Sequence, residues 1–130
     1  MRRHNTRNFV KLYFNASEEE KLSILCRAKA LILPSSGEVF SYTAMEAMAC
    51  GTPVVASYAV PGEVLIDGVN GIRVNSLNPV DYANALERLL NNEELLLRLS
   101  RGGLSFVQGF DYVKVASRYL ELIGRLLNTS

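Results

Sequence analysis

Two carboxylates stand eight positions apart around the start of an expected helix. Glu38 lies in the preceding loop, and Glu46 falls in the second turn. Between them, the backbone amides of Phe40, Ser41 and Tyr42 would be the unpaired N–H groups of the helix N-terminus, where the helix dipole favours an anion. Carboxylates in turn accept hydrogen bonds from vicinal hydroxyls, as acidic residues do with ribose in dinucleotide folds. The combination suits a ligand with both a diphosphate and sugar hydroxyls.

Two simpler interpretations of these residues remain open. Thr43 and Glu46 have the spacing of a capping box, in which the glutamate side chain bonds back to the amide of the capping residue. Glu38 is compatible with a solvated loop position, and Phe40 with core packing. Spacing and residue type therefore suggest a phosphate-and-hydroxyl site without deciding for it.

Strand-like and helix-like stretches alternate along the chain. Such alternation predicts an α/β fold with a mostly parallel sheet, in which ligands bind outside the carboxyl ends of the strands. The loop after Leu33 is one such end, and it leads into the carboxylate pair. Strands are expected over 9–14, 30–33, 53–56 and 71–74, and helices over about 17–28, 41–50, 78–90, 92–101 and from 111 onward.

Local signals mark the ends of these helices. Gly51 stands where a left-handed C-cap is expected, and Gly102-Gly103 predicts the end of the helix that follows Asn92. The N-capping signals are Ser17 with Glu20, Asn78-Pro79, Asn92 and Asp111. The side chains expected to face the core are Val80, Ala83, Leu86 and Leu90 in one helix, and Val113, Ala116, Leu120, Ile123 and Leu127 in the last.

Composition indicates one soluble globular domain over residues 1–130, with a flexible tail over 1–7. Hydrophobic residues make up 48% of the 130 and charged residues 21%, and the net charge is +1. A charge so close to zero gives no field that would attract nucleic acid. No apolar run approaches the ~20 residues that a membrane span needs.

The cysteines and the histidine limit the kinds of metal site and catalytic site that the chain can form. Cys26 and Cys50 lack metal-type spacing, and in a chain without an export signal they predict buried free thiols in a reducing compartment. His4, the single histidine, lies in the expected tail, which argues against a His-based triad or metal site. No metal and no cofactor are expected.

A series of motifs then carries a family resemblance. In chain order they are Glu18-Glu19-Glu20-Lys21-Leu22, Leu33-Pro34-Ser35, Glu38-x7-Glu46, Ala47-Met48-Ala49-Cys50-Gly51-Thr52-Pro53-Val54-Val55-Ala56, Pro61-Gly62-Glu63, Asp67-Gly68-Val69-Asn70-Gly71 and Phe110-Asp111-Tyr112. Together they resemble the group 1, family-four glycosyltransferases. The resemblance covers nearly the whole chain from about Asn8, and the central string is highly specific.

The resemblance implies the C-terminal, nucleotide-sugar-binding domain of a GT-B fold, with three layers and a Rossmann-like, mostly parallel sheet of about four strands. In that family, the second glutamate of the signature holds the ribose of a nucleotide-sugar donor, and the first contacts hydroxyls of the transferred sugar. The amides that follow the first glutamate cradle the diphosphate. The implied catalytic residue is Glu38, and the implied donor-binding residues are Glu46, Gly37, Phe40, Ser41 and Tyr42.

The chain departs from the family pattern in two ways. Val39 and Ser41 stand where the family usually has glycine. Val39 adds a β-branched side chain at a tight turn, whereas Ser41 adds a hydroxyl that could meet a phosphate. We also expect two earlier β-α units, with an Arg/Lys pair that neutralises the diphosphate, and the N-terminal acceptor-binding domain to be missing.

The implied reaction is retaining transfer of a sugar from a nucleoside-diphosphate sugar to an acceptor, with the isolated chain inactive. The expected partners are the donor and either the missing acceptor domain or a second copy of the chain, and not nucleic acid. The implied location is cytoplasmic, with peripheral contact at the inner face of the membrane as an option for the parent enzyme.

Two other functions compete with this one. A non-catalytic module that binds a nucleotide sugar, or one half of a split transferase, would also carry these motifs. A transferase assay with and without a partner chain would discriminate between them. An unrelated flavodoxin-like binding domain ranks last, because it leaves the Glu-x7-Glu string unexplained.

Overall fold

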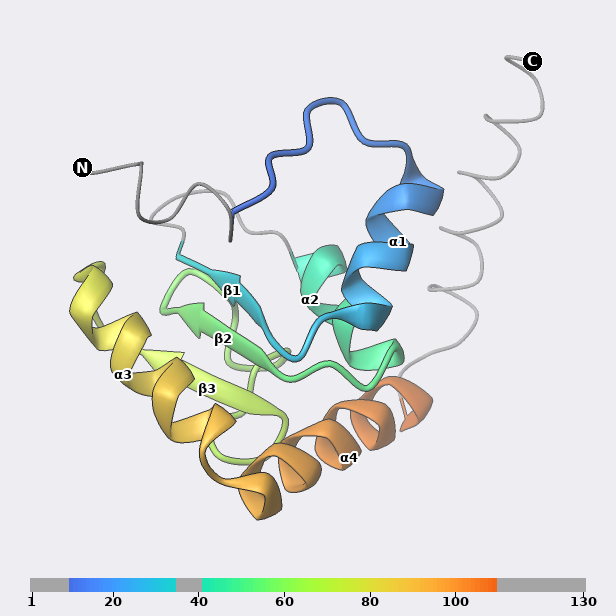
Figure 1. The fold of residues 1–130 in the computed structure, drawn as a ribbon. Helices are drawn as coiled ribbons and strands as arrows, with labels where there is room; N and C mark the ends of the chain where they lie inside the picture. The colour runs from blue at the N-terminus through green and yellow to red at the C-terminus, as the bar shows by residue number, and fades with distance from the viewer. Residues whose placement is uncertain (1–9, 35–40, 110–130) are drawn as a thin grey trace.

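The computed structural model describes residues 10–34 and 41–109. Within them the chain forms an α/β fold in which helices and strands largely alternate (Figure 1). The elements are α1 (Glu18–Arg27), β1 (Leu31–Leu33), α2 (Ser41–Ala49), β2 (Val54–Ser57), β3 (Gly71–Val74), α3 (Pro79–Leu90) and α4 (Glu93–Gly109). The predicted fold class is confirmed.

The described strands form one parallel sheet in the order β1-β2-β3. Leu31 pairs with Val54, and Val54 in turn pairs with Gly71. All four residues of β2 are buried, as expected for a short apolar run in the middle of a parallel sheet. The sheet therefore has β2 as its centre, and both of its faces must be covered.

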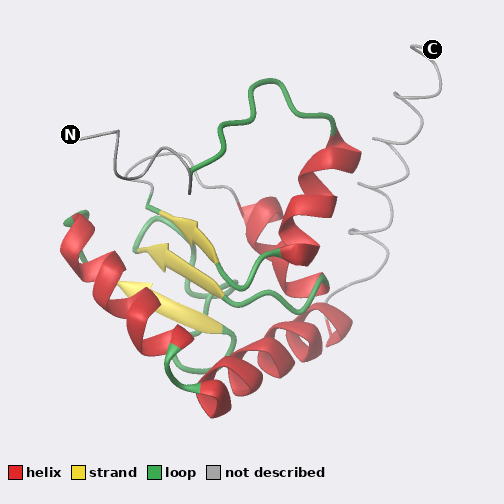
Figure 2. Cartoon of the chain, in the orientation of Figure 1, coloured by secondary structure: helices red, strands yellow, loops and turns green. Residues whose placement is uncertain are grey.

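Helices cover both faces of the sheet, so the fold has three layers (Figure 2). On one face, α1 and α2 enclose a core with Val54 and Ala56. On the other, α3 encloses a second core with Val55 and Ile72. Helix α4 contributes side chains to both cores. Leu95 and Leu99 of its first half pack in the core beneath α3, whereas Phe106 and Val107 pack against the core beneath α1 and α2.

The strand predicted over 9–14 is wrong for its described part. Residues 10–14 form no strand, and Leu12 and Phe14 are 73% and 82% exposed. The segment crosses above the carboxyl ends of the strands and enters α1 (Figure 1). Aromatic and β-branched residues favour a strand only where a sheet edge supplies backbone partners, and the segment does not run along one.

The N-capping signals on described residues and the C-cap expected at Gly51 are confirmed. Ser17 Oγ accepts a hydrogen bond from the Glu20 amide at 3.1 Å, and the Glu20 carboxylate closes the capping box. Asn78 and Asn92 cap α3 and α4 with side-chain oxygens 3.0 Å from the amides two and three residues on. Gly51 has φ +76° directly after α2, the left-handed conformation that glycine adopts at lowest cost. Asp111 and the helix predicted after it lie outside the described residues.

The inward face predicted for α3 is wrong by a partial turn. Val80 is 60% exposed and Leu90 is also exposed, whereas Tyr82 and Leu89 are buried. The prediction followed aliphatic residues and left out Tyr82, whose ring packs inward while its hydroxyl donates to the Ser76 carbonyl oxygen at 2.9 Å. An amphipathic side chain of this kind can fill a core position once its polar end has a partner.

Helix α4 does not end at Gly102-Gly103 as predicted, but continues to Gly109. The two glycines permit close packing instead. A Cβ on Gly102 would overlap the backbone carbonyl of Val69, and one on Gly103 would lie 3.1 Å from Met48 on α2. Glycine inside a helix costs stability relative to alanine, and here the close approach of α4 to its neighbours explains its presence.

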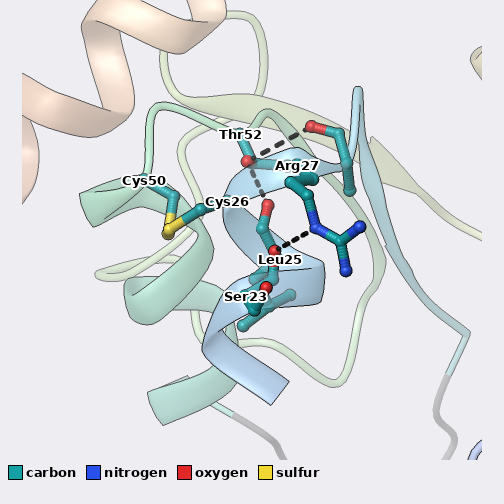
Figure 3. The surroundings of a disulfide bond; sticks show 7 residues. Ser23, Leu25, Cys26, Arg27, Cys50 and Thr52 are labelled. Carbon is teal, nitrogen blue, oxygen red and sulfur yellow. Dashed lines mark hydrogen bonds between the residues drawn. A yellow bond between two sulfur atoms is a disulfide. The ribbon is translucent and has the colours of Figure 1, made fainter. Parts of the chain in front are cut away.

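The prediction of buried free thiols is also wrong. Cys26 in α1 and Cys50 after α2 form a disulfide, with their Cα atoms 4.8 Å apart (Figure 3). Neither cysteine is fully buried. Beside the disulfide, the buried Thr52 hydroxyl donates to the Leu25 carbonyl oxygen at 2.7 Å. The cysteines thus join α1 to the end of α2, and they no longer support assignment to a reducing compartment.

We expect Gly102→Ala to destabilise the fold by about 1–3 kcal/mol, because its Cβ meets backbone that cannot move aside cheaply. Helix propensity alone would give the opposite sign, a gain of about 1 kcal/mol. Gly109→Ala is the matched control in the same helix, since nothing lies within 4 Å of its Cβ. Urea unfolding of both variants distinguishes the two effects, and a stabilised Gly102→Ala protein would contradict the packing argument.

We expect Cys26→Ser to lower the free energy of unfolding by about 3 kcal/mol under non-reducing conditions, because the cross-link no longer restricts the unfolded chain. Thermal unfolding with and without dithiothreitol provides the internal control. Reductant should lower the stability of the wild-type chain toward that of the variant and leave the variant unchanged. A wild-type chain insensitive to reductant, with two titratable thiols, would show that the disulfide is absent in solution.

Candidate functional site

The predicted site lies where β1 ends and α2 begins, at the carboxyl end of the sheet (Figure 1). Gly37, Glu38 and Phe40 lie outside the described residues. Ser41 is the first residue of α2, and Tyr42, next to it, is 55% exposed. The first amides of α2 have no intrahelical acceptor, which is the property on which the predicted diphosphate site depends.

The capping-box interpretation of Thr43 and Glu46 is wrong. Helix α2 begins at Ser41, so Thr43 lies inside the first turn and cannot be the N-cap. Glu46 falls in the second turn, as predicted. Its carboxylate pairs with a side chain on α1.

That partner is Lys21. The Lys21 Nζ atom lies 3.1 Å from Glu46 Oε1 and 3.4 Å from Glu18 Oε2. The Glu46 side chain is only 7% exposed, whereas that of Lys21 is 36% exposed. The ion pair therefore joins a nearly buried carboxylate on α2 to a cation at the surface of α1.

The pKa of Lys21 is raised above its usual 10.5. Burial by itself lowers that pKa, but the hydrogen bond to Glu46 and the charges of Glu46 and Glu18 outweigh it. The stability that this pair contributes is thus fully present below pH 10.5 and is lost as the pH rises through the folded-state pKa. Around neutral pH the ammonium is charged and the pair is intact.

Sequence reasoning did not single out Lys21 as part of the site. The Glu18-x-x-Lys21 spacing indicates only an ordinary pair on one helix face. No local pattern links Lys21 to a glutamate 25 positions later. The packing of α1 against α2 brings them together.

Arg73 in β3 holds the loop that follows β2. Its guanidinium donates to the carbonyl oxygens of Val60 and Leu65 at 2.8 Å each, and to that of Ser57 at 3.3 Å. Asn70, fully buried, accepts from the Ile66 amide at 2.8 Å and closes the next part of that loop. Arg73 is therefore engaged with backbone, which argues against the role in phosphate binding that a basic residue near a diphosphate site could take.

The described residues contain neither a membrane-spanning helix nor a cluster of metal ligands. Across residues 10–34 and 41–109, no helix is long and apolar enough to cross a membrane. In the same part of the chain, no three His, Cys, Asp or Glu side chains are arranged to hold a metal ion.

Comparison with known proteins assigns the family. Residues 1–105 match the family described as Glycosyl transferases group 1. The chain belongs to this family. Among curated proteins, an uncharacterized glycosyltransferase from Methanocaldococcus jannaschii is 35% identical over 111 residues, which are 85% of this chain and 32% of that protein. A D-inositol 3-phosphate glycosyltransferase from Frankia alni is 42% identical over 91 residues, which are 68% of this chain and 22% of that protein.

Solved structures of similar fold include other glycosyltransferases. The C-terminal domain of a glycosyl transferase group 1 family protein from Francisella tularensis aligns with a TM-score of 0.68 and 26% identity, covering 75% of this chain and 50% of that one. Anabaena Alr3699/HepE in complex with UDP and glucose aligns with a TM-score of 0.72 and 20% identity, covering 95% and 34%. The latter likeness shows the fold alone.

This group 1 glycosyltransferase chain thus corresponds to part of the C-terminal domain of such proteins. It spans 22–32% of the length of the two curated relatives. The predicted family and GT-B domain type are confirmed. The roles of the individual site residues stay predictions.

We expect Arg73→Lys to destabilise the chain by about 2 kcal/mol, because an ammonium cannot reproduce the fork that donates to three carbonyl oxygens. Arg88→Lys, on the exposed side of α3, is the control and should be neutral within about 0.5 kcal/mol. Chemical denaturation measures both changes. Equal stability of Arg73→Lys and the wild-type chain would show that the three bonds contribute little.

Proposed function

We propose that this chain is the donor-binding part of a glycosyltransferase that transfers sugar from a nucleoside-diphosphate sugar with retention of configuration. The observation that carries the proposal is the nearly buried Glu46 carboxylate at the start of α2, paired with a cation, in a chain of the group 1 family. A carboxylate desolvated in this way is costly unless its hydrogen bonds are made. In this proposal, hydroxyls of the donor ribose donate to the same carboxylate.

The other roles follow from the position of Glu46. The amides at the start of α2 point toward the carboxyl end of the sheet, where a diphosphate would meet both the N–H groups and the positive end of the helix dipole. Glu38, four positions before Tyr42, accepts hydrogen bonds from hydroxyls of the transferred sugar in this proposal. The two carboxylates thus hold the two sugars, and the amides hold the diphosphate between them.

The proposed chemistry is charge stabilisation. When the bond between the sugar C1 and the diphosphate oxygen breaks, negative charge grows on the leaving diphosphate, and fixed amide dipoles stabilise it more than they stabilise the intact donor. The acceptor oxygen then bonds to C1 on the face that the diphosphate leaves, and its proton passes to the departing phosphate oxygen. The acceptor-binding residues lie outside these 130 residues in this proposal, so the isolated chain binds donor without turnover.

We expect Glu46→Gln to weaken binding of the nucleoside diphosphate about tenfold, because the amide keeps the shape of the side chain but is a poorer acceptor for ribose hydroxyls. Isothermal titration calorimetry with UDP, GDP and ADP identifies the base and measures the loss. The change in stability should be small, about 1 kcal/mol, since Lys21 can turn to water.

Glu87→Gln on the exposed face of α3 is the matched control and should leave the affinity unchanged. Equal affinity of the wild-type chain and Glu46→Gln for the nucleotide would remove Glu46 from the donor site. Absence of binding to all three nucleotides would overturn the proposed function itself.

A further inference from the structure

The Lys21–Glu46 ion pair is asymmetric in exposure and in geometry. Lys21 Nζ contacts one carboxylate oxygen, Oε1, at 3.1 Å. Glu46 is nearly buried, while Lys21 keeps contact with water and with Glu18 on its own helix. The lysine is therefore the partner that can move, and the carboxylate is the group whose orientation depends on the pair.

A buried carboxylate without a cation loses the partner that offsets its desolvation, and it can lower its free energy by turning toward water. A turned Glu46 would leave the site and would no longer present its oxygens to a pair of vicinal hydroxyls.

The backbone around Lys21 is fixed at both ends of α1. The capping box of Ser17 and Glu20 sets the start of the helix at Glu18, three residues before Lys21. At the other end, the Cys26–Cys50 disulfide and the bond from the Thr52 hydroxyl to the Leu25 carbonyl oxygen fasten α1 to the segment after α2 (Figure 3). The distance from Lys21 to Glu46 is thus set by two helices that are tied together.

We propose that Lys21 is a positioning residue for donor binding: its ammonium holds the Glu46 carboxylate oriented so that this carboxylate can accept hydrogen bonds from both ribose hydroxyls. This inference rests on the proposed function of Glu46 and extends the donor site to α1. The ligand class is the ribose of a nucleoside diphosphate, and Lys21 acts on it through Glu46 without touching the phosphates.

The test is a double-mutant cycle of Lys21→Met and Glu46→Gln, measured with two ligands. The ligands are the nucleoside diphosphate that the wild-type chain binds, among UDP, GDP and ADP, and the matching nucleoside, which has the ribose but no phosphate. Calorimetry measures the affinity for the diphosphate, and NMR titration measures the weaker affinity for the nucleoside. Lys29→Met, which removes an exposed lysine just after α1, is the charge-matched control.

Lys21→Met should lower the affinity for both ligands by a similar factor, about tenfold. In the Glu46→Gln background it should cause no further loss of affinity. Lys21→Arg, which keeps the charge, should bind within about threefold of the wild-type chain. Lys29→Met should bind as the wild-type chain does. Melting temperatures of all variants show whether a loss of binding follows a loss of folded protein.

Each other outcome counts against the inference. A loss for the diphosphate but not for the nucleoside would mean that Lys21 binds phosphate directly. An equal loss in both Glu46 backgrounds would mean that Lys21 acts independently of Glu46. Unchanged binding by Lys21→Met, with Glu46→Gln still impaired, would overturn the role of Lys21 and leave the proposed function standing. No binding by the wild-type chain would overturn the proposed function and this inference with it.

Discussion

The fold depends on one constraint, the burial of strand β2 on both faces. Val54, Val55 and Ala56 have no exposed surface, so β2 needs a parallel neighbour on each side and a helix layer on each face. A parallel connection from β1 to β2 has to cross back along the sheet, and α2 is that crossing. Its start is therefore brought to the carboxyl end of β1. The position of the candidate site follows from the need to cover β2.

Close contacts then fix the helices relative to one another. Gly102 and Gly103 let α4 press against the Val69 backbone and against Met48, and the Ser100 hydroxyl donates to the Gly51 carbonyl oxygen at 2.7 Å. The Cys26–Cys50 disulfide fastens α1 to the same end of α2. The carboxyl-terminal end of α2 is thus held by contacts with α4 and α1, while its start faces the candidate site (Figure 1).

The basic residues Arg73 and Lys21 have different structural roles. Arg73 donates to three backbone carbonyl oxygens and holds the loop after β2. Loss of Arg73 would therefore change the conformation of that loop. Lys21 neutralises the one nearly buried carboxylate of α2. A buried carboxylate that is paired yet close to the end of the sheet contributes little to stability, because desolvation offsets most of the attraction.

The sequence by itself determined the features that depend on neighbouring residues. The caps at Ser17, Asn78 and Asn92 and the left-handed Gly51 involve contacts within a few positions of the chain. The strands around Ile32, Val55 and Ile72 were recognisable from their residue types, and the motif string indicated the family. The tertiary structure decided what depends on distant segments. These features are the exposed path of 10–14, the inward turn of Tyr82, the passage of α4 through its glycines, the Cys26–Cys50 disulfide and the Lys21–Glu46 pair. The physical reason is that each of these features depends on a contact, or on the lack of one, with a segment far away in the chain. Residue types and spacing do not specify which distant segment will pack against a given surface.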